Sequence, residues 1–174
     1  MIKSAYRTVG LSLGGSTVSI REATAEDASV IARFVRRMVE AMASVGGHPA
    51  TNSREEWARL ENEICDKVGK QDHVYLLAEV VDSEPTPIGL AGARVVSLAP
   101  VFEPRRVLHI HSLYVSESHR KRGVGQALLE TVIDWGRDLG CVEAELSVLV
   151  RNPARSLYQK LGFGVFEMEM TRKL

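Results

Sequence analysis

The feature that most restricts the fold is a strand–turn–helix–strand succession over residues 106–150. The apolar stretch RVLHIHSLYV ends at Val115, and an amphipathic helix is predicted from about residue 123 to 139, with Gly140 closing it. The next stretch, 141–150, alternates apolar and polar residues, as a strand with one buried face does. Two strands joined through a helix are parallel neighbours in one sheet. The succession therefore predicts a β-α-β crossover.

The remaining segments predict further strands and helices around this crossover. Strands are expected at about 17–22, 73–81, 88–98 and 164–172, and helices at about 25–44, 53–68 and 153–161. This order predicts an α+β fold of three layers, with a mixed, mostly antiparallel central sheet flanked by helices. Residues 1–16 end in two glycines and are interpreted as a loose N-terminal extension, which leaves a single domain over residues 17–174.

Composition excludes several classes of protein. The chain of 174 residues is 45% hydrophobic and 25% charged, with 22 basic and 22 acidic side chains, so it offers no overall field for nucleic acid. No apolar run approaches the roughly 20 residues of a membrane span, and the N-terminus is too weakly apolar for a secretory signal. The two cysteines, Cys65 and Cys141, lie in unrelated contexts, which predicts free thiols and a cytoplasmic location.

The turn of the crossover, RKRGVG at residues 120–125, contains the residues that indicate a binding function. A helix that begins there presents unpaired backbone amides and the positive end of its dipole, a natural site for phosphate. Gly123 and Gly125 remove Cβ atoms that would hold a phosphate away from the backbone. Position 128 is Leu, so the dinucleotide motif G-x-G-x-x-G is absent, and no Walker motif is present. Two glycines also occur at the start of helices that bind no ligand. The turn alone is therefore compatible with a phosphate site and with a plain helix start.

The surrounding residues narrow this choice. Arg120-Lys121-Arg122-Gly123-Val124-Gly125 matches R/Q-x-x-G-x-G/A, and the chain resembles the GNAT N-acetyltransferase superfamily, whose acetyl-CoA signature this is. Further matches are the fourth-strand segment Leu113-Tyr114-Val115 and the A-x-x-L-Y-x-x-L-G-F element formed by Ala154, Leu157, Tyr158 and Leu161-Gly162-Phe163. The order of elements fits that superfamily from about residue 17 to 172.

The resemblance implies transfer of an acetyl group from acetyl-CoA to a primary amine of a small molecule or peptide, by direct attack in a ternary complex. It implies that strands four and five splay apart, that the turn amides hold the pyrophosphate, and that the Val115 amide polarises the thioester carbonyl. The family's usual Asn position is Arg151 here, with Asn152 one place later. The residues expected to bind the cofactor are Leu113, Tyr114, Val115, Arg120, Lys121, Arg122, Gly123, Val124, Gly125, Gln126 and Asn152.

Acetyl transfer needs a proton donor and a base. The resemblance makes Tyr158 the donor to the departing thiolate. His109 and His111 are expected on one face of their strand, and H-x-H-x-L-x-V is similar to the serotonin (arylalkylamine) N-acetyltransferases, whose paired histidines relay protons. His111, nearer the splay, is preferred if one acts alone. Either histidine is also compatible with a structural role, and the pair with two zinc ligands, but a third ligand is missing, so no metal is expected.

Other features remain open in the sequence. If neither histidine acts, the polar side chains at Glu143, Glu145 or Ser147 offer places to hold an ordered water. By resemblance the acceptor enters over residues 42–57 and 99–106, where Trp57 and Phe102 are candidates to line a pocket. Homodimers are common in the superfamily, but no seam is visible in the sequence. A non-catalytic acyl-CoA-binding module is the main alternative, and a dinucleotide-dependent oxidoreductase is disfavoured by the missing third glycine.

Overall fold

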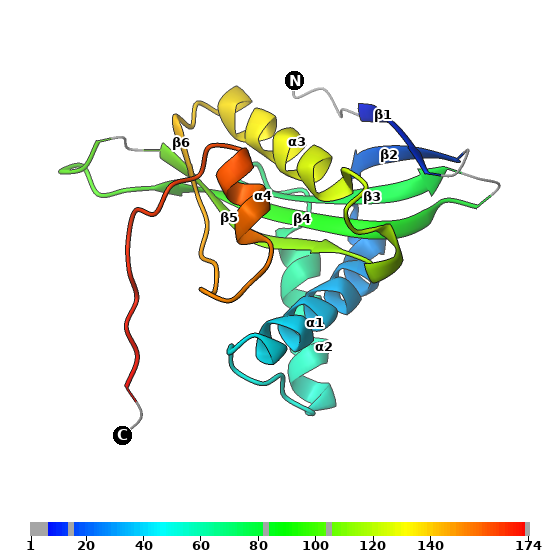
Figure 1. Cartoon of the computed structure of the whole chain (residues 1–174), viewed down its shortest axis with the longest axis horizontal. Helices are drawn as coiled ribbons and strands as arrows, with labels where there is room; N and C mark the ends of the chain where they lie inside the picture. Colours follow the sequence, from blue (N-terminus) through cyan, green and yellow to red (C-terminus); the bar gives the residue numbers. More distant parts are fainter. Residues whose placement is uncertain (1–6, 14–15, 82–83, 104–105, 173–174) are drawn as a thin grey trace.

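The fold is a single sheet of six strands between two layers of helices (Figure 1). The computed structural model describes residues 7–13, 16–81, 84–103 and 106–172. The strands are β1 (Arg7–Leu13), β2 (Ser16–Glu22), β3 (His73–Val81), β4 (Thr86–Ser97), β5 (Arg106–Val115) and β6 (Glu143–Glu145). They lie in the order β1-β2-β3-β4-β5-β6, antiparallel throughout except for the parallel pair β5–β6. The predicted mixed, mostly antiparallel sheet is therefore confirmed.

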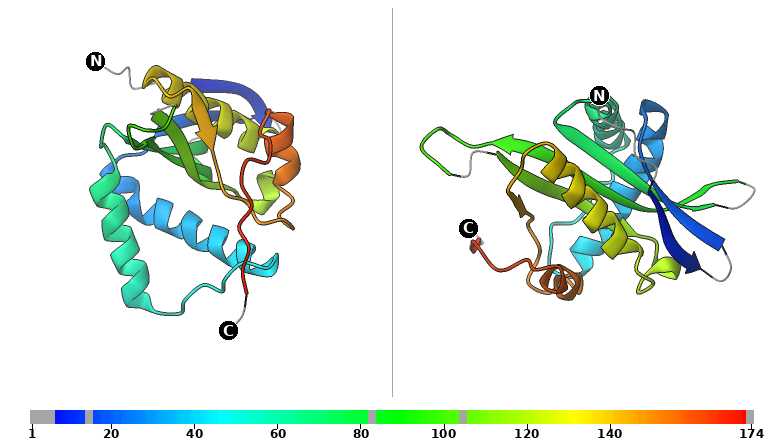
Figure 2. Two further views of the ribbon diagram at one scale, coloured as in Figure 1. Left: turned by 90° about the vertical axis from the view of Figure 1, so that its left-hand side faces the viewer. Right: turned by 90° about the horizontal axis from the view of Figure 1, so that it is seen from above.

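The helices divide between the two faces of the sheet. They are α1 (Ala28–Ser44), α2 (Arg54–Lys67), α3 (Val124–Asp138) and α4 (Arg155–Lys160), with 3₁₀ turns η1 (Ala25–Asp27) and η2 (Glu117–His119). Figures 1 and 2 show α1 and α2 on one face and α3 and α4 on the other. None of the helices in the described ranges is long and apolar enough to cross a membrane.

Each face has its own core cluster. The cluster under α3 contains Leu128 and Val132, the inner positions that the 3.6-residue period requires. The cluster under α1 and α2 contains Ile31 and Phe34 from α1 and Ile64 from α2. Both clusters are built on alternate side chains of the same strands, because successive residues of a strand point to opposite faces.

The entry into α1 is fixed by a network of charges. The Thr24 amide donates to Asp27 Oδ2 at 2.8 Å, the backbone half of a capping box. Arg21 on β2 donates to Asp27 Oδ2 at 2.7 Å and to Glu79 Oε1 on β3 at 2.8 Å. The guanidinium of Arg21 lowers the pKa of the Asp27 carboxyl. These bonds connect two neighbouring strands with the first turn before α1.

The N-terminal expectation requires correction. Residues 7–13 form β1, which pairs antiparallel with β2 from Arg7 opposite Ile20 to Leu13 opposite Ser16. The interpretation of residues 1–16 as a loose extension is therefore wrong for this stretch, while residues 1–6 and 14–15 lie outside the described residues. The two glycines that suggested a linker lie between β1 and β2.

The other end of the sheet also differs from expectation. The strand predicted over 141–150 is reduced to three residues, which pair with Val107 to His109 on β5. The strand predicted over 164–172 does not form, and residues 163–172 carry no helix or strand. β6 is the edge strand of the sheet, and on its outer side it pairs with no strand of the described residues. No second hydrogen-bond ladder therefore supports a longer strand here.

Candidate active site

The site begins where β5 and β6 diverge. β6 pairs with β5 only as far as Glu145, whereas β4 continues beside β5 to Val115. The Ser116 amide donates to the Ile88 carbonyl oxygen at 2.8 Å, so this residue faces β4. Backbone groups alternate in direction along a strand, and those of Leu113 and Val115 therefore face away from β4 into the opening. The predicted splay of the two parallel strands is confirmed.

The glycine turn closes one end of this opening. Gly123 is the N-cap of α3 and has a φ of 85°, in the left-handed region that glycine adopts without strain. Lys121 also has a positive φ, 59°. A Cβ on Gly123 would lie 2.9 Å from Leu11 Cδ2 of β1. The first helical bond runs from the Ala127 amide to the Gly123 carbonyl oxygen, 3.0 Å, so the amides of residues 124–126 precede the helical ladder and have no bond within it.

The second glycine has a different environment. A Cβ on Gly125 would lie 3.4 Å from Leu157 Cδ2 and 3.6 Å from Val115 Cγ2, both ordinary contacts. This Cβ would point toward the junction of α3, α4 and β5. Close approach of a phosphate therefore depends on the backbone shape at Gly123 more than on a missing Cβ at Gly125, a distinction that the sequence did not reveal.

The three cations of the turn also divide into two kinds. Arg120 Nε donates to the Val115 carbonyl oxygen at 3.0 Å, and its guanidinium lies 5.6 Å from the ring centroid of Tyr114. Arg120 therefore fastens the turn to the end of β5. Lys121 and Arg122 are exposed and leave their charge beside the helix start. The Tyr114 side chain is buried in the α1–α2 core, and its backbone pairs with Leu90 of β4, so Tyr114 does not line the opening.

Asn152 has a local bond. Its Oδ1 accepts a hydrogen bond from the Ala154 amide at 2.9 Å, in an Asx turn just before α4. This bond orders the entry to α4. It engages the side-chain oxygen of Asn152, the residue that was expected to contact the cofactor.

Tyr158 of α4 is half-buried and packs against the cluster under α3. Its ring packs edge-on against Phe163, with centroids 6.1 Å apart and planes at 69°. Burial raises the pKa of Tyr158 above its ordinary value, so the phenol is protonated at neutral pH. No hydrogen bond of the hydroxyl group to another side chain is found within the described part of the chain.

His111 occupies a bulge in β5. The pairs Ala93–Ile110 and Gly92–Ser112 are adjacent on β4, but on β5 they are separated by His111, which has no partner in the ladder. Such an extra residue shifts the alternation of the strand by one position. Side chains that follow the bulge consequently change faces, which a strict period of two does not predict.

The bulge leaves the His111 ring half-buried in the sheet. The ring meets Tyr75 edge-on at 5.5 Å between centroids, and its Nδ1 lies 3.0 Å from Ser112 Oγ. Gly92 makes room for it, because a Cβ there would lie 2.6 Å from His111 Cε1. Burial, followed by the charge of His109, lowers the pKa of His111 to about 4. His111 is therefore neutral at physiological pH.

His109 is more accessible and has a carboxylate partner. Its Nδ1 lies 3.1 Å from Glu145 Oε1, and the two residues are directly paired between β5 and β6. The imidazole is 26% exposed. The contact with Tyr75 places His111 on the face that carries α1 and α2; the sequence predicted only that the two histidines share a face. The Glu145 partner was missed, because the pairing register of two parallel strands is not readable from either strand alone.

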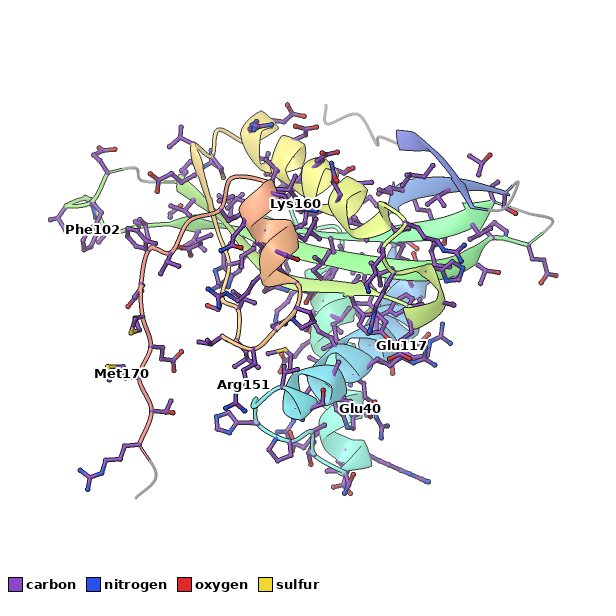
Figure 3. All side chains as sticks on the ribbon, in the orientation of Figure 1. Glu40, Phe102, Glu117, Arg151, Lys160 and Met170 are labelled. Carbon is purple, nitrogen blue, oxygen red and sulfur yellow. The ribbon has the colours of Figure 1, made fainter. Side chains whose placement is uncertain are left out.

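The loop after α1 forms the other rim. A Cβ on Gly47 would lie 2.9 Å from the Met42 carbonyl oxygen and 3.0 Å from Leu149 Cδ1, so this loop touches the chain that follows β6. Phe102 is 57% exposed and lies far from Glu40 of α1 (Figure 3). Trp57 lies under Arg36 of α1, with 5.4 Å between the guanidinium carbon and the ring centroid, and a shared pocket of Trp57 and Phe102 stays a prediction. Over the described ranges no group of three or more His, Cys, Asp or Glu side chains is placed to hold a metal ion.

Comparison with known proteins identifies the family. A model of the acetyltransferase (GNAT) family matches residues 39–163, and the chain belongs to this family. Human N-acetyltransferase 8 is 35% identical over 85 residues, which cover 48% of this chain and 37% of that protein. The chain thus spans little more than a third of the curated relatives it matches.

Solved structures agree over a longer stretch. A tetramutant of the BH1408 protein of Bacillus halodurans is 26% identical, covering 89% of this chain and 99% of that one with a TM-score of 0.74. A predicted acetyltransferase of Clostridium acetobutylicum, solved with acetyl-CoA, is 16% identical over 90% of this chain and 96% of that one, with a TM-score of 0.73. AAC(6′)-Iy in complex with the bisubstrate analogue CoA-S-monomethyl-acetylneamine is 19% identical over 90% and 97%, with a TM-score of 0.66. At these lower identities the last two support the fold.

Proposed function

We propose that this protein transfers the acetyl group of acetyl-CoA to a primary amine of a small molecule or peptide. The observation that carries this proposal is the opening beyond the β5–β6 pair, lined by the inward-facing backbone of Leu113 and Val115 and closed by the start of α3 at Gly123. The solved complex of AAC(6′)-Iy with a CoA-linked amine supports an amine as acceptor.

The turn and β5 hold the cosubstrate. The unpaired amides of residues 124–126 and the dipole of α3 attract a diphosphate, and the exposed cations Lys121 and Arg122 add charge beside it. The backbone groups of Leu113 hydrogen-bond the pantetheine arm, and the Val115 amide faces the thioester carbonyl, because the Val115 carbonyl oxygen already accepts from Arg120. Bound acetyl-CoA supplies the acetyl group as a thioester whose leaving group is a thiolate.

The His109–Glu145 pair receives the proton of the acceptor. An alkyl ammonium with a pKa of about 10.4 must lose its proton before attack, which costs about 4 to 5 kcal/mol at pH 7. The Glu145 carboxylate accepts the Nδ1–H of His109, which leaves Nε2 free to take up a proton. His111, held neutral by burial, lies between His109 and Leu113 along β5. Its low pKa makes it a weak final acceptor, so the geometry favours His109 over the His111 preferred from the sequence.

Tyr158 donates a proton to the departing thiolate. The buried phenol is protonated at neutral pH, as a donor to the departing thiolate must be. Arg120 and Asn152 act by position, because each is bonded to the backbone that shapes the opening.

The test is release of free thiol from acetyl-CoA over a broad panel of amines, together with calorimetric binding of CoA. We expect Tyr158→Phe and His109→Gln each to lower kcat by on the order of 10²-fold with little change in CoA affinity. Glu145→Gln should lower kcat and shift the pH–rate profile, whereas Glu143→Gln, which makes the same change two residues earlier on β6, should not. CoA binding without turnover of any amine would instead support a non-catalytic binding module, and absence of CoA binding would contradict both.

A further inference from the structure

Leu11 of β1 lies directly on the turn that begins α3. A Cβ built on Gly123 would lie 2.9 Å from Leu11 Cδ2, 3.7 Å from its Cδ1 and 3.9 Å from its Cγ. Apart from the neighbours of Gly123 in the chain, these are the three nearest heavy atoms, so one side chain covers this side of the glycine. Leu11 is half-buried and packs against the core cluster under α3. The first strand therefore contacts the start of the helix that is proposed to hold the diphosphate (Figure 1).

A bulge in β1 accompanies this contact. β1 pairs with β2 at Val9 and again at Ser12, but the two partners on β2 are adjacent residues. Residues 10–11 therefore bulge out of the ladder, and a bulge re-aims a side chain away from the regular alternation of its strand. β1 is the edge strand opposite β6 and pairs with β2 alone. The edge strand thus departs from regular pairing at the residue that touches the turn.

The turn has a conformation that depends on contacts of this kind. Lys121 and Gly123 both have a positive φ, 59° and 85°. A residue other than glycine stays in the left-handed region only where the surrounding structure holds it there. Two supports come from within the crossover, namely the bond of Arg120 to the end of β5 and the burial of Val124 in the core. Leu11 adds a third support, from a strand outside the crossover.

We propose that Leu11 is a positioning residue for the cosubstrate. Its side chain holds the backbone at Gly123 in the shape that directs the amides of residues 124–126 at the diphosphate. This inference rests on the proposed use of those amides and extends it to the N-terminal strand. Leu11 acts through the turn, so it affects binding of the cosubstrate rather than the chemical step.

The test is titration calorimetry of CoA with the full chain carrying Leu11→Ala. We expect the affinity to fall about five- to tenfold, the size of effect seen when one of two coupled contacting groups is removed. Leu11→Met keeps the volume of the side chain and should bind CoA within about twofold of the wild type. An affinity of Leu11→Ala equal to that of the wild type would overturn the inference.

Ile133→Ala is the matched control for a general loss of stability. Ile133 is a partly buried residue of α3 that packs against the same cluster as Leu11. It lies about 15 Å along the helix from Gly123, so its truncation loosens the core without reaching the turn. Ile133→Ala should therefore bind CoA as the wild type does. A loss of affinity equal to that of Leu11→Ala would mean that Leu11 contributes only to stability, and the inference would fail.

A second measurement combines Leu11→Ala with Gly123→Ala. In the wild-type background the new Cβ at residue 123 meets Leu11 Cδ2, whereas Leu11→Ala leaves room for it. The loss of CoA affinity in the double variant should therefore be smaller than the product of the two single losses. A loss equal to the product would show that the two residues act independently, which contradicts the inference.

The outcomes also separate this inference from the proposed function. CoA binding that depends on Leu11 without turnover of any amine would support the inference and contradict acetyl transfer. Where transfer occurs, Leu11→Ala should raise KM for acetyl-CoA and leave kcat unchanged, and a fall in kcat at unchanged KM would contradict the inference alone. A wild type that binds no CoA would contradict both.

Discussion

The position of His111 in the fold determines the protonation state of its imidazole. It is the unpaired residue of a bulge, packed against Tyr75 and fitted over the bare backbone of Gly92. Burial opposes the charged form of the imidazole, so the native state holds His111 neutral well below the pH at which an unfolded histidine gains a proton. His109 has a different environment, because its Nδ1 lies 3.1 Å from Glu145 Oε1 of β6.

This difference predicts a specific pH dependence of stability. The pKa of His111 is about 4 in the native state, against an unfolded value of about 6.5. Between these values the unfolded state binds a proton that the native state does not, so the free energy of unfolding falls as the pH falls. From pH 7 to pH 5 the loss from this group is about 2 kcal/mol. Urea unfolding at the two pH values should show that His111→Gln removes this part of the dependence.

A matched variant separates this effect from the general acid sensitivity of the protein. His48 lies exposed in the loop between α1 and α2, and His48→Gln removes an imidazole without removing a buried one. It should retain the pH dependence of the wild type. A His111→Gln variant that loses as much stability on acidification as the wild type would show that His111 is not held neutral by the fold.

At the scale of elements, the turn before α3 depends on one glycine more than the other. Gly123 has a left-handed φ of 85° at the N-cap and is closely approached by Leu11, whereas Gly125 has room for a Cβ. An alanine in the left-handed region costs roughly 1 to 2 kcal/mol and is relieved by moving the backbone. Such a movement displaces the amides that are proposed to hold the diphosphate.

We therefore expect Gly123→Ala to weaken CoA binding by about tenfold or more, in line with a strain of roughly 1 to 2 kcal/mol expressed at the binding site. Gly125→Ala should bind CoA within a few-fold of wild type. Titration calorimetry of both variants makes the comparison. Equal losses for the two variants would mean that missing Cβ atoms, rather than the left-handed backbone, create the site.

The sequence predicted most elements, and the exceptions share a physical cause. Amphipathic periods located α1, α2 and α3, and the splay of β5 and β6 followed from the family resemblance. Three features depend on long-range pairing that no local pattern encodes: the addition of β1 to β2, the bulge at His111 and the His109–Glu145 bond. The strand predicted over 164–172 shows the opposite case. Its residues favour an extended backbone, but a strand forms only when a neighbouring strand pairs with it.

At the scale of the whole molecule, the sheet separates two tasks. The α3–α4 side carries the start of α3, and the α1–α2 side carries the loop after α1 (Figures 1 and 2). Tyr158 packs against the cluster under α3, and His111 packs against Tyr75 of the cluster under α1 and α2. The opening between β5 and β6 joins the two sides through the sheet. In the proposed function, the cosubstrate and the acceptor meet at this opening from opposite faces of the sheet.

The most direct test of this account is the amide NMR spectrum of the protein, whose chain of 19.2 kDa is suited to it, recorded with and without CoA. Binding in the opening predicts the largest shifts at Leu113, Val115 and residues 123–126, with small changes on β1 to β3. Saturable shifts that leave the β5 end and the start of α3 unchanged would place the cosubstrate elsewhere and contradict the account.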